Sequence, residues 1–336
     1  MRSVVDALCS PECAGRRSGT KEGEAARAVV VSALREAGLD PSEQAVPRCG
    51  GANVLATIPG DVDRYVVVAA HFDHLGKDRG RVYWGADDNA AAVAILVEVA
   101  RSIARQKEGR GVILAAFDGE EPPFFLSEAM GSQHFVRHAK EAIDFMVCMD
   151  LVGHRFGPAG VPDDVGQSLF ALGAERSRGT YELVAGLKRA EPGLVVRGVD
   201  AEIIPPLSDY EPFWRKQIPF LFLSAGRSRV YHTPEDTPEK LDYPKMEATA
   251  RWLTRFVRAA RTREDAAFDD AGRADLASLD ELREVLSSLV TLAPEARMAL
   301  SYVQTLRDAC DAEGRLPPAR RPEMTALVAQ IESRLQ

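Results

Sequence analysis

Residues with metal-ligand chemistry gather in two short motifs of this 336-residue chain, His71-Phe72-Asp73-His74 and Gly85-Ala86-Asp87-Asp88-Asn89. The apolar run 65–70 leads directly into His71, which predicts a buried strand that ends at the histidine. Imidazole and carboxylate groups are common zinc ligands, and open α/β sheets place their sites at the carboxyl ends of strands. The two motifs therefore predict part of a metal centre, and other strand ends must supply the remaining ligands.

Later strand ends repeat this pattern. The apolar run 112–117 ends in Asp118-Gly119-Glu120-Glu121, the run 145–149 ends in Asp150, and His232 follows a further apolar run. A single aspartate at a strand end is more often a helix cap or turn former, and a single histidine is more often an ordinary surface or core residue. Their joint occurrence, one set at each strand end, favours a metal site.

Two histidines and three carboxylates are enough for a two-zinc centre. Zinc ions about 3.5–4 Å apart can share a bridging carboxylate and a bridging water, and a further carboxylate must then take the proton of that water. Glu120 and Glu121 suit these two tasks because adjacent strand residues point in different directions. Asp73 lies on the same side as His71 and suits a carboxylate that orients the imidazole.

The elements that must position these residues alternate along the chain. Helical patterns cover 22–37, which ends before Gly38, and 90–104. Strand patterns cover 54–59, 65–71, 112–117, 145–149, 169–172 and 220–223. This order predicts an α/β fold with a mixed, mostly parallel twisted sheet and helices on both faces.

The C-terminal part of the chain differs in composition. Residues 264–275 are mostly small, polar and charged, and three apolar stripes at helical spacing follow, at Leu279–Leu289, Leu300–Leu306 and Met324–Leu335. We predict a metal-binding α/β domain over 1–262, a linker over 263–277 and an all-helical extension over 278–336. The extension packs either on the core or on a partner subunit, so a homo-oligomer through these helices is an open expectation.

Composition limits the partners. A formal net charge of −8 argues against a nucleic-acid surface, and no apolar run of about 18 residues predicts a membrane span. The N-terminal sequence does not have the apolar core of a secretory leader. The five cysteines are an odd, scattered set, which favours free thiols and a cytoplasmic location.

The motifs together, in their order along the chain, resemble the M28 family of zinc peptidases, which includes the bacterial leucyl-type aminopeptidases. The resemblance covers roughly residues 1–262 and implies the corresponding zinc-exopeptidase fold. It rests on Gly15-Arg16-Arg17-Ser18-Gly19, His71-Phe72-Asp73-His74-Leu75-Gly76, Gly85-Ala86-Asp87-Asp88-Asn89, Glu120-Glu121, Gly131-Ser132, Ser208-Asp209 and Tyr231-His232-Thr233-Pro234-Glu235-Asp236-Thr237.

The resemblance implies a role for each candidate residue. It implies two Zn²⁺ ions, with Asp88 as the bridging ligand and a cis peptide bond after it. The terminal ligands would be His71 and Asp150 for one ion, and Glu121 and His232 for the other. Among the catalytic residues, Glu120 matches the general base, Asp73 the residue that orients His71, and Tyr231 a phenol that stabilises the oxyanion.

Three segments depart from the family pattern. Ala91-Ala92 replaces the usual Ser-Gly, and Tyr210 follows Ser208-Asp209 where the family has a histidine. The link after Glu121 is long and reads Pro122-Pro123-Phe124-Phe125, which resembles an E-E-P-P-F-F subgroup. Phe124 and Phe125 could equally line a substrate pocket or anchor the loop.

The function that the resemblance implies is that of a co-catalytic dizinc aminopeptidase. Such an enzyme removes N-terminal residues from a peptide substrate through a metal-bridging hydroxide and the Glu120 base. Carboxypeptidase, dipeptidase or glutaminyl-cyclase activity on the same scaffold is the alternative, and the cyclase type works with one zinc. A non-catalytic binding protein is disfavoured because the ligand set and Glu120 are all retained.

Overall fold

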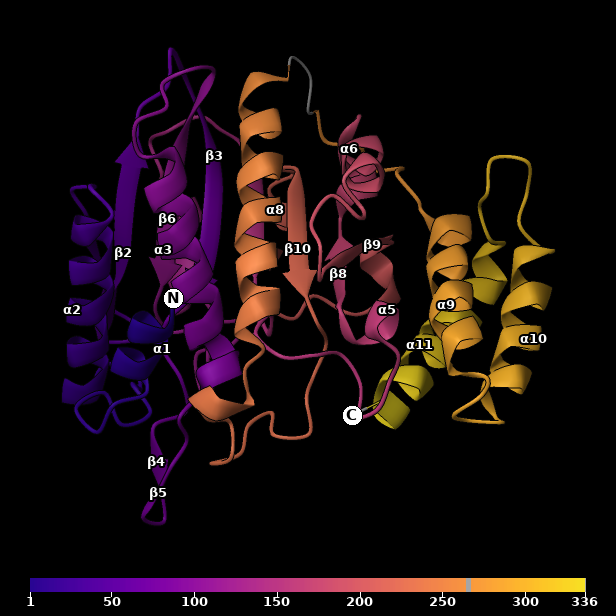
Figure 1. The fold of residues 1–336 in the computed structure, drawn as a ribbon. Coiled ribbons are helices and arrows are strands. Elements are labelled where there is room, and N and C mark those ends of the chain that lie inside the picture. The colour runs from indigo at the N-terminus through magenta and orange to yellow at the C-terminus, as the bar shows by residue number, and fades with distance from the viewer. Residues whose placement is uncertain (264–266, 336) are drawn as a thin grey trace.

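The computed structural model describes residues 1–263 and 267–335, and its centre is an eight-stranded sheet with the strand order β1-β2-β6-β3-β7-β10-β8-β9 (Figure 1). The strands are β1 (Ser42–Val46), β2 (Gly51–Ile58), β3 (Val62–His71), β6 (Arg110–Phe117), β7 (Ile143–Met149), β8 (Ser168–Leu172), β9 (Val195–Val199) and β10 (Phe220–Ser224), with β4 (Lys77–Asp78) and β5 (Arg81–Val82) forming a separate ribbon. The helices are α1 (Arg2–Leu8), α2 (Lys21–Glu36), α3 (Ala91–Ile103), α4 (Gly131–His138), α5 (Asp163–Gly166), α6 (Thr180–Gly186), α7 (Glu211–Arg215), α8 (Tyr243–Thr262), α9 (Asp275–Leu289), α10 (Ala296–Arg307) and α11 (Arg321–Leu335), with short helical turns η1 (Ala86–Ala90) and η3 (Ala201–Ile203) among the connections.

The sheet is mixed, as predicted. The pairs β3–β6, β3–β7, β7–β10 and β8–β9 are parallel, and β1–β2, β2–β6 and β8–β10 are antiparallel. The central strands β6, β3, β7 and β10 therefore run in one direction, so that their carboxyl ends meet at one edge. That edge is where an open α/β sheet places its site.

Alternate residues of β3 explain why both faces of the sheet are covered. Val66, Val68 and Ala70 are buried against one core that includes α2, α3 and α8, and Val67 and Ala69 belong to a second core on the opposite face. Figure 1 shows α2, α3 and α8 side by side on the face toward the viewer. A strand buried on both faces reads as a continuous apolar run, which is why the sequence predicts it well.

The three C-terminal helices follow the predicted apolar stripes. Helix α9 packs on the edge strand β9 and on α10, and the stripe residues Leu279, Leu286 and Leu289 are buried in the second core. Figure 1 shows α9, α10 and α11 beyond β9, at the far end of the sheet from α2. Part of the predicted linker, 264–266, lies outside the described residues, and the division of the chain into domains stays a prediction.

Two strands of the eight-stranded sheet escape prediction for identifiable reasons, β1 and β9. The edge strand β1 is mostly exposed, with only Val46 buried, so it does not have an apolar run. In β9 a buried arginine, Arg197, interrupts the apolar residues. Within the described residues, no helix combines the length and the apolar character needed to cross a bilayer.

Candidate metal centre

The predicted site residues come together at the carboxyl edge of the central strands. His71 is the last residue of β3, Glu120 and Glu121 follow β6, and Asp150 follows β7. Asp88 lies in η1, at the start of α3, and His232 lies in the loop after β10. Segments that are far apart in sequence therefore contribute to one buried cluster.

His71 faces three carboxylates. Its Nε2 atom lies 3.5 Å from Asp88 Oδ1, 3.5 Å from Asp150 Oδ1 and 3.8 Å from Glu120 Oε2. The other ring nitrogen, Nδ1, lies 3.3 Å from the carbonyl oxygen of Asp73, a contact that requires Nδ1 to donate. In the neutral imidazole the proton therefore sits on Nδ1, and the Nε2 lone pair is then available on the side of the carboxylates.

Asp88 connects this group to a second one. His232 Nε2 lies 3.1 Å from Asp88 Oδ2 and 3.3 Å from Glu121 Oε2. The two carboxylate oxygens of Asp88 thus face two different imidazoles. This is the arrangement that a ligand shared by two metal ions requires.

The donor set fits zinc. Within the described part of the chain, His71 Nε2 and Asp150 Oδ1 are buried without a hydrogen-bond partner. The carboxylates of Asp88, Glu120, Glu121 and Asp150 outnumber the imidazoles of the cluster, and burial of carboxylates is costly unless cations or donors compensate it. Imidazole nitrogens and carboxylate oxygens on convergent, buried side chains are a zinc donor set.

His74 lies next to the site, and the sequence did not indicate its role. One ligand atom each from His71, Glu120 and Asp150 lie within 4.8 Å of one another, and the same holds for His74, Asp88 and Glu121. His74 Nδ1 is already engaged at 2.7 Å with Glu121 Oε1, whereas His232 faces the opposite oxygen of the same carboxylate. We therefore assign His74 to holding Glu121 in place and keep His232 as the ligand candidate.

Ionisation of the cluster shows how the charges compete. Burial raises the pKa of Asp88, and the Glu121 carboxylate raises it further. Burial also raises the pKa of Glu120 well above its usual range, with Asp150 and Glu121 acting in the same direction. Burial lowers the pKa of His232, but its hydrogen bonds to Asp88 and Glu121 outweigh that effect and raise the pKa to about 10. Asp88, Glu120 and His232 thus bind protons more readily than usual. Burial would raise the pKa of Glu121 as well, but its contacts with His232 and His74 outweigh that effect and lower the pKa.

Asp73 organises the strand end that carries the two glutamates. Its carboxylate accepts hydrogen bonds from the backbone N–H groups of Glu120, at 3.1 Å, and Glu121, at 3.2 Å. Its backbone carbonyl, rather than its carboxylate at 3.6 Å, accepts the hydrogen bond from His71 Nδ1. Asp73 therefore positions both the imidazole and the glutamate pair.

Two further residues, Asp236 and Arg16, hold the backbone of Asp88. Asp236 accepts hydrogen bonds from the backbone N–H groups of Asp87, at 2.9 Å, and Asp88, at 3.1 Å. The Asp87 carboxylate turns away and holds His154 Nδ1 at 2.7 Å. Arg16, fully buried, donates to the carbonyls of Phe72, Trp84, Gly85 and Asp88. The quoted motifs contain Arg16, Asp87 and Asp236, but their spacing gives no indication of these partners.

The backbone takes special conformations at the ligands. The Asp88–Asn89 peptide bond is cis, as the family resemblance implies, and Pro122–Pro123 is also cis. Leu151 and His232 both have φ of +55°, in the left-handed region that non-glycine residues rarely adopt. Such conformations cluster at functional sites, where the surrounding structure holds them.

Two aromatic residues border the cluster. The Tyr231 ring stacks on His232 with ring centroids 3.9 Å apart, and burial raises the pKa of its hydroxyl so that it stays a neutral donor. Phe125 lines a cavity that also reaches Asp150 and Tyr231. Of the two open interpretations of the Phe124-Phe125 link, the lining of a pocket therefore applies to Phe125.

The sheet and its covering helices have the zinc-exopeptidase fold, and comparison with solved structures agrees. The structure superposes on the LapA aminopeptidase of Legionella pneumophila with a TM-score of 0.64 at 16% sequence identity, over 78% of this chain and 72% of that one. It superposes on the glutaminyl cyclase of Porphyromonas gingivalis with a TM-score of 0.59 at 19% identity, over 77% of this chain and 96% of that one. At these identities the likeness shows the fold.

Sequence relatives give the family. The sequence profile of Peptidase family M28 matches residues 53–257, and the chain belongs to this family of zinc-dependent hydrolases. It is 28% identical to the protein YfbL of Escherichia coli K12 over 227 residues, 61% of this chain and 70% of YfbL. It is also 28% identical to a glutaminyl-peptide cyclotransferase of Boiga irregularis over 252 residues, which is 61% of this chain and 64%, less than two thirds, of that protein.

Proposed function

We propose that the protein is a dizinc aminopeptidase. The observation that carries the proposal is the position of Asp88, whose two carboxylate oxygens face His71 at 3.5 Å and His232 at 3.1 Å. Asp150 completes the first group and Glu121 the second, so each of two ions would receive one imidazole and one terminal carboxylate. When bound, zinc would polarise the scissile carbonyl and acidify a water molecule.

The chain's own residues supply the proton transfer. Glu120 Oε2 lies 3.8 Å from His71 Nε2, beside the ligands, and its raised pKa suits a carboxylate that accepts a proton near neutral pH. Glu120 would take the proton of the attacking water and give it to the departing amine. The Tyr231 hydroxyl, kept neutral by burial, would donate to the carbonyl oxygen as negative charge develops on it.

Glu120→Gln tests this role. We expect turnover of aminoacyl p-nitroanilides to fall by roughly 10²–10⁴-fold, while zinc content measured by elemental analysis stays at the wild-type level. Glu128→Gln is the matched control, because Glu128 lies on the loop that follows and its side chain is exposed at 57%. Wild-type turnover in Glu120→Gln would remove the glutamate from the mechanism.

A glutaminyl cyclase is the second candidate, favoured by the cyclotransferases among the sequence relatives and by the cyclases among the similar structures. In that reaction the N-terminal amine attacks the side-chain amide carbon of glutamine and releases ammonia. The same buried cluster would then polarise an amide carbonyl instead of activating water.

Two measurements separate the candidates. Zinc-loaded protein is offered aminoacyl anilides and, separately, a peptide with N-terminal glutamine, with mass spectrometry to report which bond changes. Elemental analysis gives the zinc-to-protein ratio, for which the aminopeptidase proposal requires two and cyclase chemistry one. Release of ammonia from N-terminal glutamine, with no cleavage of any anilide, would replace the first proposal by the second.

A further inference from the structure

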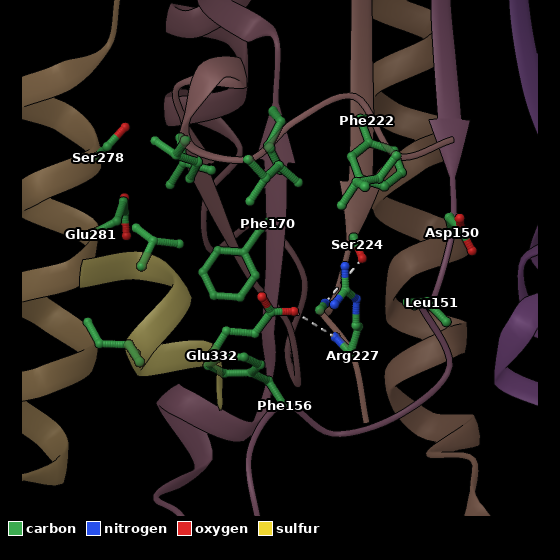
Figure 2. A pocket seen from close by; sticks show the side chains of 18 of the residues that line it. Asp150, Leu151, Phe156, Phe170, Phe222, Ser224, Arg227, Ser278, Glu281 and Glu332 are labelled. Atoms are coloured by element: carbon green, nitrogen blue, oxygen red, sulfur yellow. Dashed lines mark hydrogen bonds between the residues drawn. The ribbon is translucent and has the colours of Figure 1, made fainter. Parts of the chain in front are cut away.

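A cavity of about 270 Å³ opens beside the metal centre. Asp150 and Tyr231 line it at the end next to the metal centre, and Phe125 of the long link after Glu121 lines it as well. Figure 2 shows Asp150 and Leu151 at one end of the cavity and Glu281 on α9 at the other. The cavity is therefore continuous with the place where a substrate carbonyl would be held.

The cavity walls are mostly apolar. Phe156 and Phe170 pack edge to face, with ring centroids 5.0 Å apart, and Phe222 of β10 lines the cavity as well (Figure 2). Loop residues after η3, among them Ile204 and Leu207, extend the apolar lining. A volume slightly below the range of about 300–1,000 Å³ that ligand sites occupy suits one side chain better than a whole peptide.

The outer wall comes from helices that the family profile does not cover. Leu282 and Val285 of α9 line the cavity, as do Val328, Ile331 and Glu332 of α11, whereas the profile ends at residue 257. At the rim the backbone N–H of Arg227 donates to the Glu332 carboxylate at 3.4 Å, the dashed contact drawn in Figure 2. This wall is thus a feature of this chain's own extension.

Buried polar contacts hold the wall in position. Arg197 of β9, fully buried, donates to Glu281 of α9 at 2.8 Å. Arg321, at the start of α11, lies 2.9 Å from Asp200 and 3.3 Å from Asp275, the first residue of α9. The helices are therefore tied to the sheet end, so that the pocket is formed before a ligand arrives.

We propose that α9 and α11 form the outer wall of a pocket that receives a bulky, uncharged apolar side chain of the substrate. On this wall Glu281 is paired with Arg197, and the Glu332 carboxylate accepts a hydrogen bond from the backbone N–H of Arg227. The aliphatic side chains Leu282, Val285, Val328 and Ile331 supply the rest of the wall and favour an apolar occupant. The proposal rests on the proposed function, since it places the substrate's reacting carbonyl at the metal centre. It assigns the extension to substrate choice.

Hydroxamates of single amino acids test the pocket by binding alone. Affinities of L-phenylalanine hydroxamate and L-alanine hydroxamate for the zinc-loaded protein are measured by calorimetry on wild type, Val328→Phe and Ile331→Ala. We expect wild type to bind the phenylalanine compound at least about tenfold more tightly, because its ring is buried. Val328→Phe fills the pocket and should remove that preference, with affinity for the alanine compound changed less than about twofold.

The matched control is Ala329→Phe, which places the same side chain on an exposed position of α11. It should keep the wild-type preference. Ile331→Ala enlarges the pocket with little risk of misfolding, and its preference should change relative to wild type. Equal affinities of wild type for the two hydroxamates, or equal preference in all variants, would overturn the proposal. Failure of the proposed function is separately visible, as wild type that binds hydroxamates but cleaves no aminoacyl anilide.

Discussion

Two clusters of charged residues differ in how their charge is balanced. In the metal centre, the carboxylates of Asp88, Glu121 and Asp150 face imidazoles. In a second cluster, between β9 and α9, Glu281 and Glu284 face Arg197 at 2.8 and 2.9 Å, and Lys188 at 2.7 and 2.9 Å. We call this second group the anchoring cluster, and its members are Lys188, Arg197, Glu281 and Glu284.

The different partners of the carboxylates indicate different roles: the first cluster can bind cations, and the second connects α9 to β9. In the metal centre the pKa values of Asp88 and Glu120 are raised, because burial and neighbouring carboxylates act together. In the anchoring cluster, burial raises the pKa of Glu284 but Lys188 and Arg197 outweigh it, so that the net shift is downward. The anchoring cluster is neutralised from within the chain, whereas the carboxylates of the metal centre outnumber its imidazoles. The two clusters should therefore fail under different treatments.

Removal of metal should have the largest effect and should act on one cluster alone. Treatment with a chelator should abolish turnover and lower the melting temperature, because the ions bind only the folded chain and their loss leaves carboxylates facing one another. Activity and melting temperature are measured before chelation, after it and after zinc is returned. Full activity in protein shown to be free of zinc would contradict the role of the first cluster as a metal centre.

Breaking the anchoring cluster should cost stability and leave metal binding intact. Arg197→Met leaves Glu281 buried beside Lys188 alone, and we expect a loss of about 3–5 kcal/mol in the free energy of unfolding, measured with urea. Zinc content should not change. Arg189→Met is the control, because Arg189 is exposed at 59% and lies 3.9 Å from Glu284. Similar losses of stability in Arg197→Met and Arg189→Met would show that the burial of the Arg197–Glu281 pair does not determine the effect.

A third prediction concerns Glu175, a buried carboxylate near the same joint whose pKa is raised although Arg176 lies 3.4 Å away. Burial raises the pKa of Glu175 to about 7, and the Asp200 carboxylate adds to the shift. The usual pKa of this carboxyl group is 4.5. Between pH 4.5 and about 7 the group ionises in the unfolded chain but stays protonated in the folded chain. The free energy of unfolding therefore falls as the pH rises through this window, and the loss is complete above about pH 7.

Glu175→Gln should remove that penalty. The variant should match wild type at pH 4 and exceed it at pH 8 by about 3 kcal/mol, measured as the free energy of unfolding at both pH values. Glu182→Gln on α6 is the control, since Glu182 is exposed. An equal gain at both pH values would exclude ionisation as the cause.

The smallest effect should follow loss of the outer cation of the anchoring cluster. Lys188 is partly exposed, and Glu281 keeps Arg197 when Lys188 is replaced by methionine. We expect Lys188→Met to lower the free energy of unfolding by about 1 kcal/mol or less, and the loss should shrink at high salt. A loss in the free energy of unfolding as large as that of Arg197→Met would mean that Lys188 contributes as much as Arg197 to the stability of this contact.

The metal centre was largely predictable because its residues occupy strand ends. Each apolar strand of a parallel sheet ends at the same edge, so His71, Glu120 and Asp150 could be grouped before any coordinates existed. The free thiols expected from the scattered cysteines are also present, since all five are unpaired. The cytoplasmic location and the oligomeric state stay predictions.

Contacts between distant segments were not predictable. The pattern of β9 was obscured by Arg197, whose burial depends on Glu281, 84 residues later in the chain. His74 stands next to Asp73 in sequence, but its partner Glu121 lies 47 residues away. A local pattern cannot indicate which of several polar residues will be satisfied by a partner that far along the chain.

The sequence by itself determined most of the buried strands, the ligand types at their ends and the family, because these depend on local periodicity and on short motifs. Only the tertiary structure decided that the two oxygens of Asp88 face different imidazoles. It also decided that helices outside the family match close a pocket beside Asp150. Both features depend on how side chains pack across the edge of the sheet, and amphipathic spacing shows only that a helix has an apolar face.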